Sequence, residues 1–207
     1  RWEIRKNAYW LIRNRTSDTI INWVKYVDWD ANIYWEVDYE TLIVNNWKLT
    51  ISWDINTWWK KLWIIVLKDN YVVTDWYKNS QKWNIFIDKD VKYINAVIYA
   101  DWWVFSLDWA WELNNQLVIK WSLFTRNTIW WWVYWTDWYT LPWGQTTTDE
   151  NLAASYDLNY IRNWNDWWDW NDEDEDWNEY NEWNNDPFVI IFNPNTQIDP
   201  PKWFDKN

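Results

Sequence analysis

Residues 82–105 read KWNIFIDKDVKYINAVIYADWWVF, and two short apolar runs, IFI at 85–87 and AVIYA at 96–100, are separated here by polar residues. Runs of the same kind recur along the chain: LIV at 42–44, IIVL at 64–67, YVV at 71–73, LVI at 117–119 and FVIIF at 188–192. Their length and their content of β-branched residues are typical of β-strands. Because helical periodicity is nearly absent, the sequence predicts an all-β fold class.

The spacing of these runs favours a repeat. Expected strands begin in pairs, at 42 and 49, 64 and 71, 85 and 91, 97 and 104, and 117 and 123. Four tryptophans stand before or between them at intervals of 20, 20 and 18 residues: Trp63, Trp83, Trp103 and Trp121. A period of this length with short strands predicts a single-stranded parallel β-helix, or β-solenoid, whose coils stack on one another.

A β-sandwich is the alternative fold. The residues NNWK at 45–48, read as a tight turn, would join two antiparallel strands and favour the sandwich. The run IIVL, however, is apolar at successive positions, as is usual for parallel strands that are buried on both faces. We therefore expect the solenoid.

Composition divides the chain into five expected segments. Residues 1–20 read as a lead-in from a missing upstream part, because the chain starts at Arg1 with neither methionine nor a leader. The other segments are solenoid coils at 21–135, a turn-rich connection with a short ordered element at 136–163, an acidic low-complexity loop at 164–186, and a strand with a proline-bounded tail at 187–207.

Charge and residue usage exclude several functional classes. The net charge of -12 repels phosphate backbones and anionic lipid, so nucleic acid is not expected as a partner. Charged residues interrupt every apolar run, so we expect no membrane insertion in this segment. The chain has no Cys and no His, which excludes disulfides, thiolate or imidazole metal sites and His-dependent catalytic triads.

Tryptophan and glycine occur in abnormal numbers, 30 and 1. A chain of this length would ordinarily carry roughly 14 glycines. The tryptophans avoid the apolar runs, and 11 of them follow Asp or Asn, where Asn-Gly and Asp-Gly turns belong. Some bacterial lineages read the UGA codon as glycine, and translating their genes with the table that reads UGA as tryptophan would give this pattern. We hypothesise that most of these tryptophans are mis-decoded glycines.

The alternative is a protein that is truly rich in tryptophan, with aromatic platforms for sugar rings. Three consecutive tryptophans at 130–132 oppose it, because they would force indoles onto both faces of any strand.

With glycine restored, several phrases resemble bacterial cell-surface parallel β-helix (β-solenoid) proteins of uncultured lineages: KWNIFIDKDVKYINAVIYADWWVF, QLVIKWSLFTRNTIWWW, YDLNYIRN and FNPNTQIDPPKWF. The resemblance covers roughly residues 20–207 and includes no catalytic motif. It implies an exported, extracellular or cell-surface element that is structural or adhesive, with surface glycans or other surface proteins as partners. A carbohydrate-binding or polysaccharide-degrading protein on the same scaffold is the second expectation.

One stretch of the acidic loop is a candidate metal site. With glycine restored, WWDWNDEDE at 167–175 approaches the calcium-binding pattern G-G-x-G-x-D-x-U-x. Asp174 stands where that pattern has an aliphatic residue, and the chain holds one copy although such sites need stacked copies. Four aspartates are the candidate Ca²⁺ ligands: Asp169, Asp172, Asp174 and Asp176. A solvated acidic loop without any cofactor is the simpler interpretation.

Carboxylates on the solenoid face are candidates for glycoside chemistry, which uses paired acids. The candidates are Asp75, Asp88, Asp101 and Asp108. Nothing in their spacing singles out a pair, and Asp beside a glycine-like residue is usually a corner residue, so we expect no enzymatic activity. Two lysine pairs, Lys60 with Lys61 and Lys89 with Lys92, are too few for an anion groove and are expected to act as solubilising edge charges.

Overall fold

The computed structural model describes residues 4, 6–8, 18–56, 62–68, 82–107, 115–127, 139–140, 146–148, 158, 161–162 and 188–192. The described strands are β1 (Thr19–Ile21), β2 (Val24–Val27), β3 (Ala31–Ile33), β4 (Thr41–Asn45), β5 (Leu49–Ile51), β6 (Leu62–Leu67), β7 (Ile85–Ile87), β8 (Tyr93–Ala100), β9 (Val104–Ser106), β10 (Leu117–Phe124), β11 (Tyr139–Thr140), β12 (Thr146–Thr147) and β13 (Phe188–Phe192). The all-β class is therefore confirmed.

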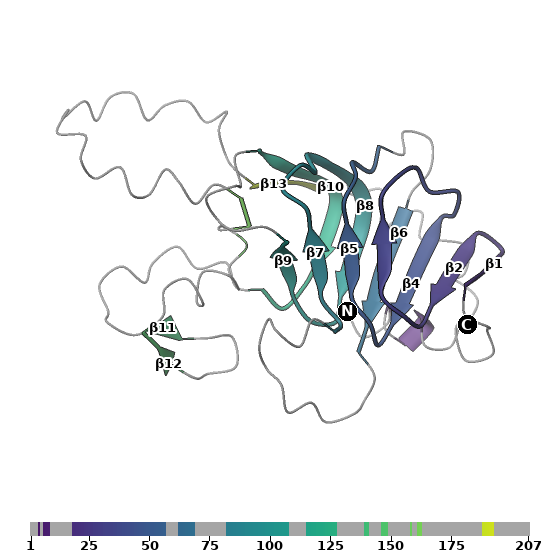
Figure 1. The fold of residues 1–207 in the computed structure, drawn as a ribbon, viewed down its shortest axis with the longest axis horizontal. Helices are drawn as coiled ribbons and strands as arrows, with labels where there is room; N and C mark the ends of the chain where they lie inside the picture. Colours follow the sequence, from purple (N-terminus) through teal and green to yellow (C-terminus); the bar gives the residue numbers. More distant parts are fainter. Residues whose placement is uncertain are drawn as a thin grey trace.

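Two sheets hold most of these strands (Figure 1). The seven-stranded sheet has the order β1-β2-β4-β6-β8-β10-β13, and the four-stranded sheet has the order β3-β5-β7-β9. All pairs in both sheets are parallel except β1 with β2, which form an antiparallel hairpin at one end. A separate small hairpin is formed by β11 and β12.

The chain passes from one sheet to the other at each step. It runs from β2 to β3, from β4 to β5, from β6 to β7 and from β8 to β9, and each strand lies beside the strand of the same sheet in the preceding pair. Parallel pairing of this kind needs a long connection, and here the strand of the other sheet lies within that connection. We call each pair of successive strands, one from each sheet, a coil.

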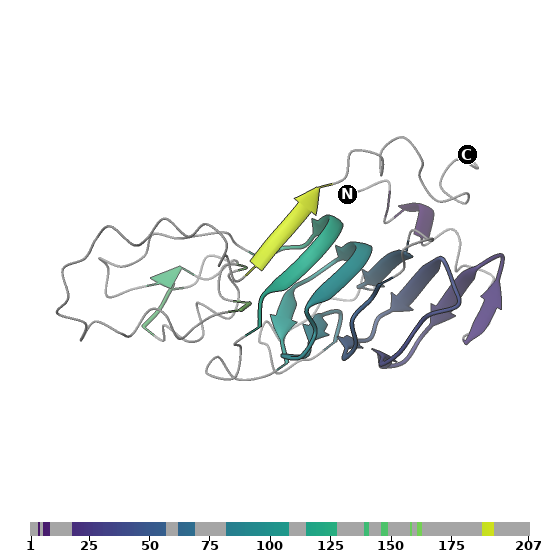
Figure 2. The same ribbon diagram turned by 90° about the horizontal axis from the view of Figure 1, so that it is seen from above.

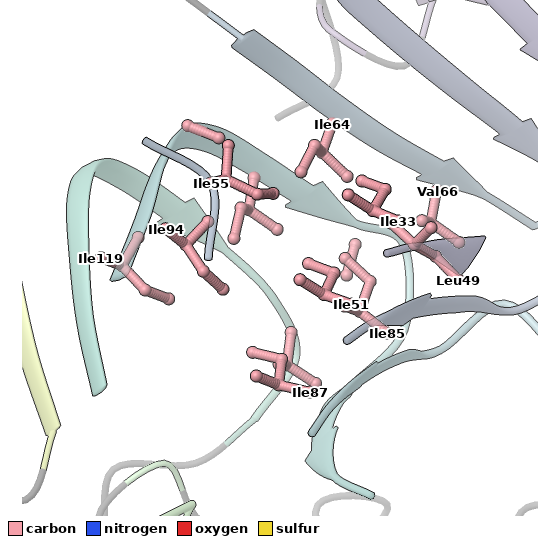
Figure 3. Close-up of a cluster of buried hydrophobic side chains, with 14 of the residues drawn as sticks. Ile33, Leu49, Ile51, Ile55, Ile64, Val66, Ile85, Ile87, Ile94 and Ile119 are labelled. Atoms are coloured by element: carbon pink, nitrogen blue, oxygen red, sulfur yellow. The ribbon is translucent and has the colours of Figure 1, made fainter. Parts of the chain in front are cut away.

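The main core lies between the two sheets (Figure 3). Alternate residues of the seven-stranded sheet point inward, among them Ile64, Val66 and Ile94, and they meet Ile51 and Ile85 of the four-stranded sheet. These five side chains are at most 1% exposed. Apolar burial against both sheets explains why a short strand such as β7 stays in register, because a one-residue slip would turn its isoleucines out of the core.

The outer face of the seven-stranded sheet is also apolar and carries a second cluster. Ile43, Ile65 and Tyr99 point outward there and pack with Ile4 and Ala8 from the start of the chain. This second layer explains why β6 is buried at all six positions and reads as a continuous apolar run.

Within the described residues, the strand positions agree with most of the sequence prediction, with two differences, and the expected strand at 71–73 lies outside those residues. Expected strands beginning at 91 and 97 are one strand, β8, and those at 117 and 123 are likewise one strand, β10. β10 continues through Trp121 with a φ of 105° at that residue, so the expected break is a local distortion inside one strand. Figure 2 shows β13 beside β10, which is its parallel partner.

The four tryptophans at intervals of about 20 do not mark one repeated position. Trp63 and Trp121 lie within strands of the seven-stranded sheet, whereas Trp83 and Trp103 precede strands of the four-stranded sheet. The strand register instead aligns Ala31, Leu49, Ile85 and Val104, at intervals of 18, 36 and 19 residues. The long interval holds the connection from β6 to β7.

Candidate functional site

Two of the four aspartates considered for glycoside chemistry, Asp88 and Asp101, lie in the described residues. Asp101 is buried, and its Oδ2 accepts from the Lys68 backbone N–H at 3.0 Å while its Oδ1 accepts from the Tyr99 hydroxyl at 2.7 Å. The Oδ1 of Asp88 accepts from the Asp90 N–H at 3.0 Å, which closes a local turn. Both aspartates therefore satisfy backbone donors, as expected of corner residues.

The structure does not bring these two aspartates together. Asp88 follows the C-terminal end of β7, whereas Asp101 precedes the N-terminal end of β9, its parallel neighbour. They stand at opposite ends of the sheet and do not form the carboxylate pair that glycoside hydrolysis needs.

Most of the other candidate residues lie outside the part of the chain that the structure describes. Outside the described residues lie Asp75, Asp108, Lys60, Lys61 and the four calcium candidates Asp169, Asp172, Asp174 and Asp176. The calcium site thus stays a prediction. In the described part of the chain, no three or more Asp, Glu, His or Cys residues gather in a way that could hold a metal ion. Lys92 is exposed and Lys89 is half-buried, and the Lys92 backbone N–H donates to Asp54 Oδ1 at 2.6 Å.

A repeated corner joins the two sheets. Two residues before the aligned positions of β3, β5, β7 and β9 stand Trp29, Trp47, Trp83 and Trp102. We call this row the tryptophan corner. Three of the four tryptophans follow Asp or Asn, and the backbone N–H of Trp83 donates to the Trp47 carbonyl at 3.2 Å. The same corner is therefore used on four successive coils.

Cations lie against the indoles of the tryptophan corner. The Lys68 ammonium is 4.1 Å from the Trp102 ring centroid, and the Arg126 guanidinium is 4.5 Å from it. The Lys82 ammonium is 4.5 Å from the Trp47 ring, and the Trp83 and Trp102 rings meet edge to face at 6.4 Å. These contacts stabilise the corner at Trp47, Trp83 and Trp102, where protein groups lie against the indoles, whereas Trp29 at the end of the row is 45% exposed.

Backbone geometry at three tryptophans is that of glycine. Trp23, Trp83 and Trp121 have φ values of 63°, 65° and 105°, in the region where a Cβ atom clashes. Trp23 is the clearest case, because Asn22 and Trp23 form the two-residue loop between paired Ile21 and Val24, and both have positive φ. A hairpin loop of this type strongly prefers Asn-Gly.

The opposite corner carries exposed aromatic rings. After Ile33 come Tyr34 and Trp35, which are 54% and 68% exposed, with ring centroids 5.2 Å apart. Trp53 follows the aligned Ile51 in the same way and is 56% exposed. Indoles thus stand outward at this corner, whereas four of the ten described tryptophans are buried: Trp63, Trp83, Trp102 and Trp103.

A sequence repeat at this second corner escaped the sequence analysis. The pattern Ile-x-x-acid-aliphatic occurs at 33–37, 51–55 and 87–91. Its aliphatic members, Val37, Ile55 and Val91, all pack into the main core. The acid of the middle copy, Asp54, accepts from two backbone N–H groups of a later coil. The recurrence of this five-residue pattern is the signal that could have revealed the coil register.

Arg162 is a second residue that the sequence analysis missed. Its side chain is fully buried and donates to the carbonyls of Asp88 and Val91, at 2.6 and 3.1 Å, and to the Ser106 hydroxyl at 3.1 Å. Its neighbours Leu158 and Ile161 belong to the main core. Leu158, Ile161 and Arg162 therefore anchor the end of the four-stranded sheet.

Burial shifts the titration of two tyrosines. Desolvation raises the pKa of Tyr39 far above its ordinary value, and the charge of Asp38 adds to the shift. Desolvation also raises the pKa of Tyr26, partly offset by a hydrogen bond with Asn45. Both phenols favour the neutral state that packing in an apolar environment requires.

Comparison of the chain with known protein families, curated proteins and solved structures finds no match. In the described part of the chain, no helix is long and apolar enough to cross a membrane.

Proposed function

We propose that the chain is a non-enzymatic structural or adhesive element of an exported bacterial surface protein, built as a single-stranded parallel β-solenoid. The observation that carries this proposal is the alternation of successive strands between two parallel sheets that share one core. Stacked coils of this kind make a rigid, elongated body whose side chains outside the core are available for contacts.

The roles of the described aspartates support a scaffold rather than an enzyme. Asp88, Asp101 and Asp54 accept hydrogen bonds from backbone N–H groups at coil corners. Carboxylates used in this way hold the turns in place, which is a structural role and differs from that of the paired acids of a glycosidase.

Glycine at most tryptophan positions is part of the proposal. A solenoid corner must turn sharply, and glycine does so at positive φ without steric cost. The positive φ of Trp23, Trp83 and Trp121 and the repeated tryptophan corner support it. Reading UGA as glycine would account for all these positions with one change.

A carbohydrate-binding role is the second candidate. The observation that favours it is the exposed group of Tyr34, Trp35 and Trp53 on neighbouring coils, since exposed aromatic faces are the groups that stack on sugar rings.

Protease treatment of intact cells that make the protein tests the surface role. We expect extracellular protease to remove the protein while a cytoplasmic marker in the same cells survives. Protection of the protein until the cells are lysed would contradict an exported surface element. The protein is detected with an antibody raised against a peptide that contains no tryptophan. Such an antibody binds equally well whether the tryptophan positions hold tryptophan or glycine.

A further inference from the structure

We propose that a cavity on the outer face of the seven-stranded sheet binds an uncharged saccharide of about disaccharide size. The cavity has a volume of about 440 Å³ and lies where β8 and β10 begin. Its described lining residues are Asn56, Tyr93, Ile94, Asn95, Val118 and Lys120. This volume is within the range of small-molecule sites in proteins, roughly 300–1,000 Å³.

Strand register places four of these side chains together. Tyr93 pairs with Val118, and Asn95 pairs with Lys120, so the four form two adjacent rungs. Side chains alternate along a strand, and Ile94 between Tyr93 and Asn95 points into the main core, so Tyr93 and Asn95 point outward (Figure 3). The cavity thus has fixed walls on the backbone of two paired strands.

The remaining side of the cavity is formed by residues of an earlier coil. Ile55 forms a parallel bridge with Ile94, and its backbone N–H donates to the Tyr93 carbonyl at 2.8 Å while its carbonyl accepts from the Asn95 N–H at 2.8 Å. Asn56 follows directly. β6 pairs with β8 only from Ala96 onward, so residues 55–56 take its place beside the start of β8 and position the Asn56 amide at the cavity.

The chemistry of the lining selects the ligand class. The Asn56 carboxamide offers a donor and an acceptor at once, which matches hydroxyl groups that both donate and accept. The Oδ1 of Asn95 accepts from the Trp121 indole N–H, so this amide oxygen is held at the cavity edge by the chain itself. Tyr93, 47% exposed, offers a ring face with a polar tip, and Val118 adds an aliphatic wall. A wholly apolar ligand would leave the Asn56 carboxamide without a hydrogen-bond partner. The net charge of -12 opposes anionic ligands. The lining therefore favours a neutral, polyhydroxylated ligand over an apolar or an anionic one.

The described lining contains no carboxylate and no tryptophan. We therefore assign binding and no hydrolysis to the cavity. Glycine at position 121 would remove the indole N–H that bonds Asn95 Oδ1 and would free this amide oxygen for a ligand hydroxyl. The inference deepens the adhesive role proposed above and rests on it for the source of the saccharide, the glycans outside the cell.

Saturation-transfer NMR on the purified full chain tests the inference, with lactose, maltose and cellobiose as neutral probes and digalacturonate as the anionic comparison. We expect saturation of ring protons in at least one neutral disaccharide and none in digalacturonate. Tyr93→Ala and Asn56→Ala should each weaken that binding about tenfold. The matched control is Asn32→Ala on β3, and Tyr34→Ala, which removes a tyrosine of similar exposure from the aromatic group at the second corner, distinguishes the two candidate sites.

Three outcomes of this experiment would overturn the inference. Binding of none of the neutral probes refutes the cavity as a saccharide site, and preference for digalacturonate refutes the neutral class. Loss of binding in Tyr34→Ala, with binding kept in Tyr93→Ala, moves the site to the aromatic corner. Circular dichroism of each variant shows whether it is folded, and Tyr93→Phe, which keeps the ring, should retain most of the affinity. Protease accessibility on cells is independent of these results, so the surface role and the binding site can fail separately.

Discussion

Replacing Trp23 and Trp53 each by glycine and by alanine isolates the backbone strain that we attribute to misplaced indoles. The two tryptophans are 55% and 56% exposed, so loss of the indole should cost about the same at each. Trp23 has a φ of 63°, whereas the φ of Trp53 is not positive. Two backbone N–H groups, of Glu40 and Thr41, donate to the Trp23 carbonyl at 2.8 and 3.1 Å, which holds the turn in this conformation.

The expected magnitudes follow from two opposing terms. A Cβ atom in the left-handed region costs about 1–2 kcal/mol, and the extra freedom of glycine in the unfolded chain costs about 0.4–1 kcal/mol. Trp23→Gly should therefore be more stable than Trp23→Ala by up to about 1.6 kcal/mol. Trp53→Gly should instead be less stable than Trp53→Ala by about 0.4–1 kcal/mol.

Urea denaturation followed by circular dichroism measures all four free energies of unfolding. Subtracting the glycine-alanine difference at Trp53 from that at Trp23 cancels both the indole loss and the entropy of glycine, and it leaves the Cβ cost of about 1–2 kcal/mol. A crossed difference near zero, or of opposite sign, would refute the argument that Trp23 occupies a glycine position.

Three further predictions concern the core, the sheet end and pH. Ile64→Ala should lower the free energy of unfolding by about 2–5 kcal/mol, because Ile64 is fully buried between the sheets, and a loss below 1 kcal/mol on urea titration would argue against a close-packed core. Arg162→Lys keeps the charge but cannot make the same set of hydrogen bonds, so we expect a loss of about 2 kcal/mol or more, and an unchanged urea midpoint would show that Arg162 does not anchor the sheet. Since burial raises the pKa of Tyr39, the folded state keeps its phenol proton after the unfolded chain has lost it; stability should be unaffected below the ordinary tyrosine pKa of about 10 and fall above it. Tyr39→Phe should reduce that fall between pH 9 and pH 11, and an identical fall in both proteins would exclude Tyr39 as its source.

Local patterns in the sequence predicted the strands well. The runs at 85–87 and 188–192 are β7 and β13 to the residue, and the run at 64–67 lies within β6. β-branched residues buried on both faces leave a signal that needs no knowledge of the partner strand.

The register of the paired strands and the packing at the end of the sheets depend on contacts between residues far apart in the sequence. The sequence alone did not predict these contacts. Equal spacing made Trp63 and Trp83 look equivalent, although one lies in the seven-stranded sheet and the other at a corner. The pairing of β13 with β10 spans the acidic loop, and Arg162 reaches the carbonyl of Asp88. The candidate cavity is made by Asn56 and by strands from two later coils, so its members show no local motif.

Peptide sequencing by mass spectrometry, on the protein isolated from the cells that make it, tests the central claim most directly. Trypsin should release residues 83–89, written WNIFIDK, and residues 121–126, written WSLFTR, and each peptide holds one tryptophan, at a position with positive φ. Our account predicts glycine at positions 83 and 121 in the natural protein. Tryptophan in both peptides would contradict the glycine corners and with them the proposed origin of this sequence.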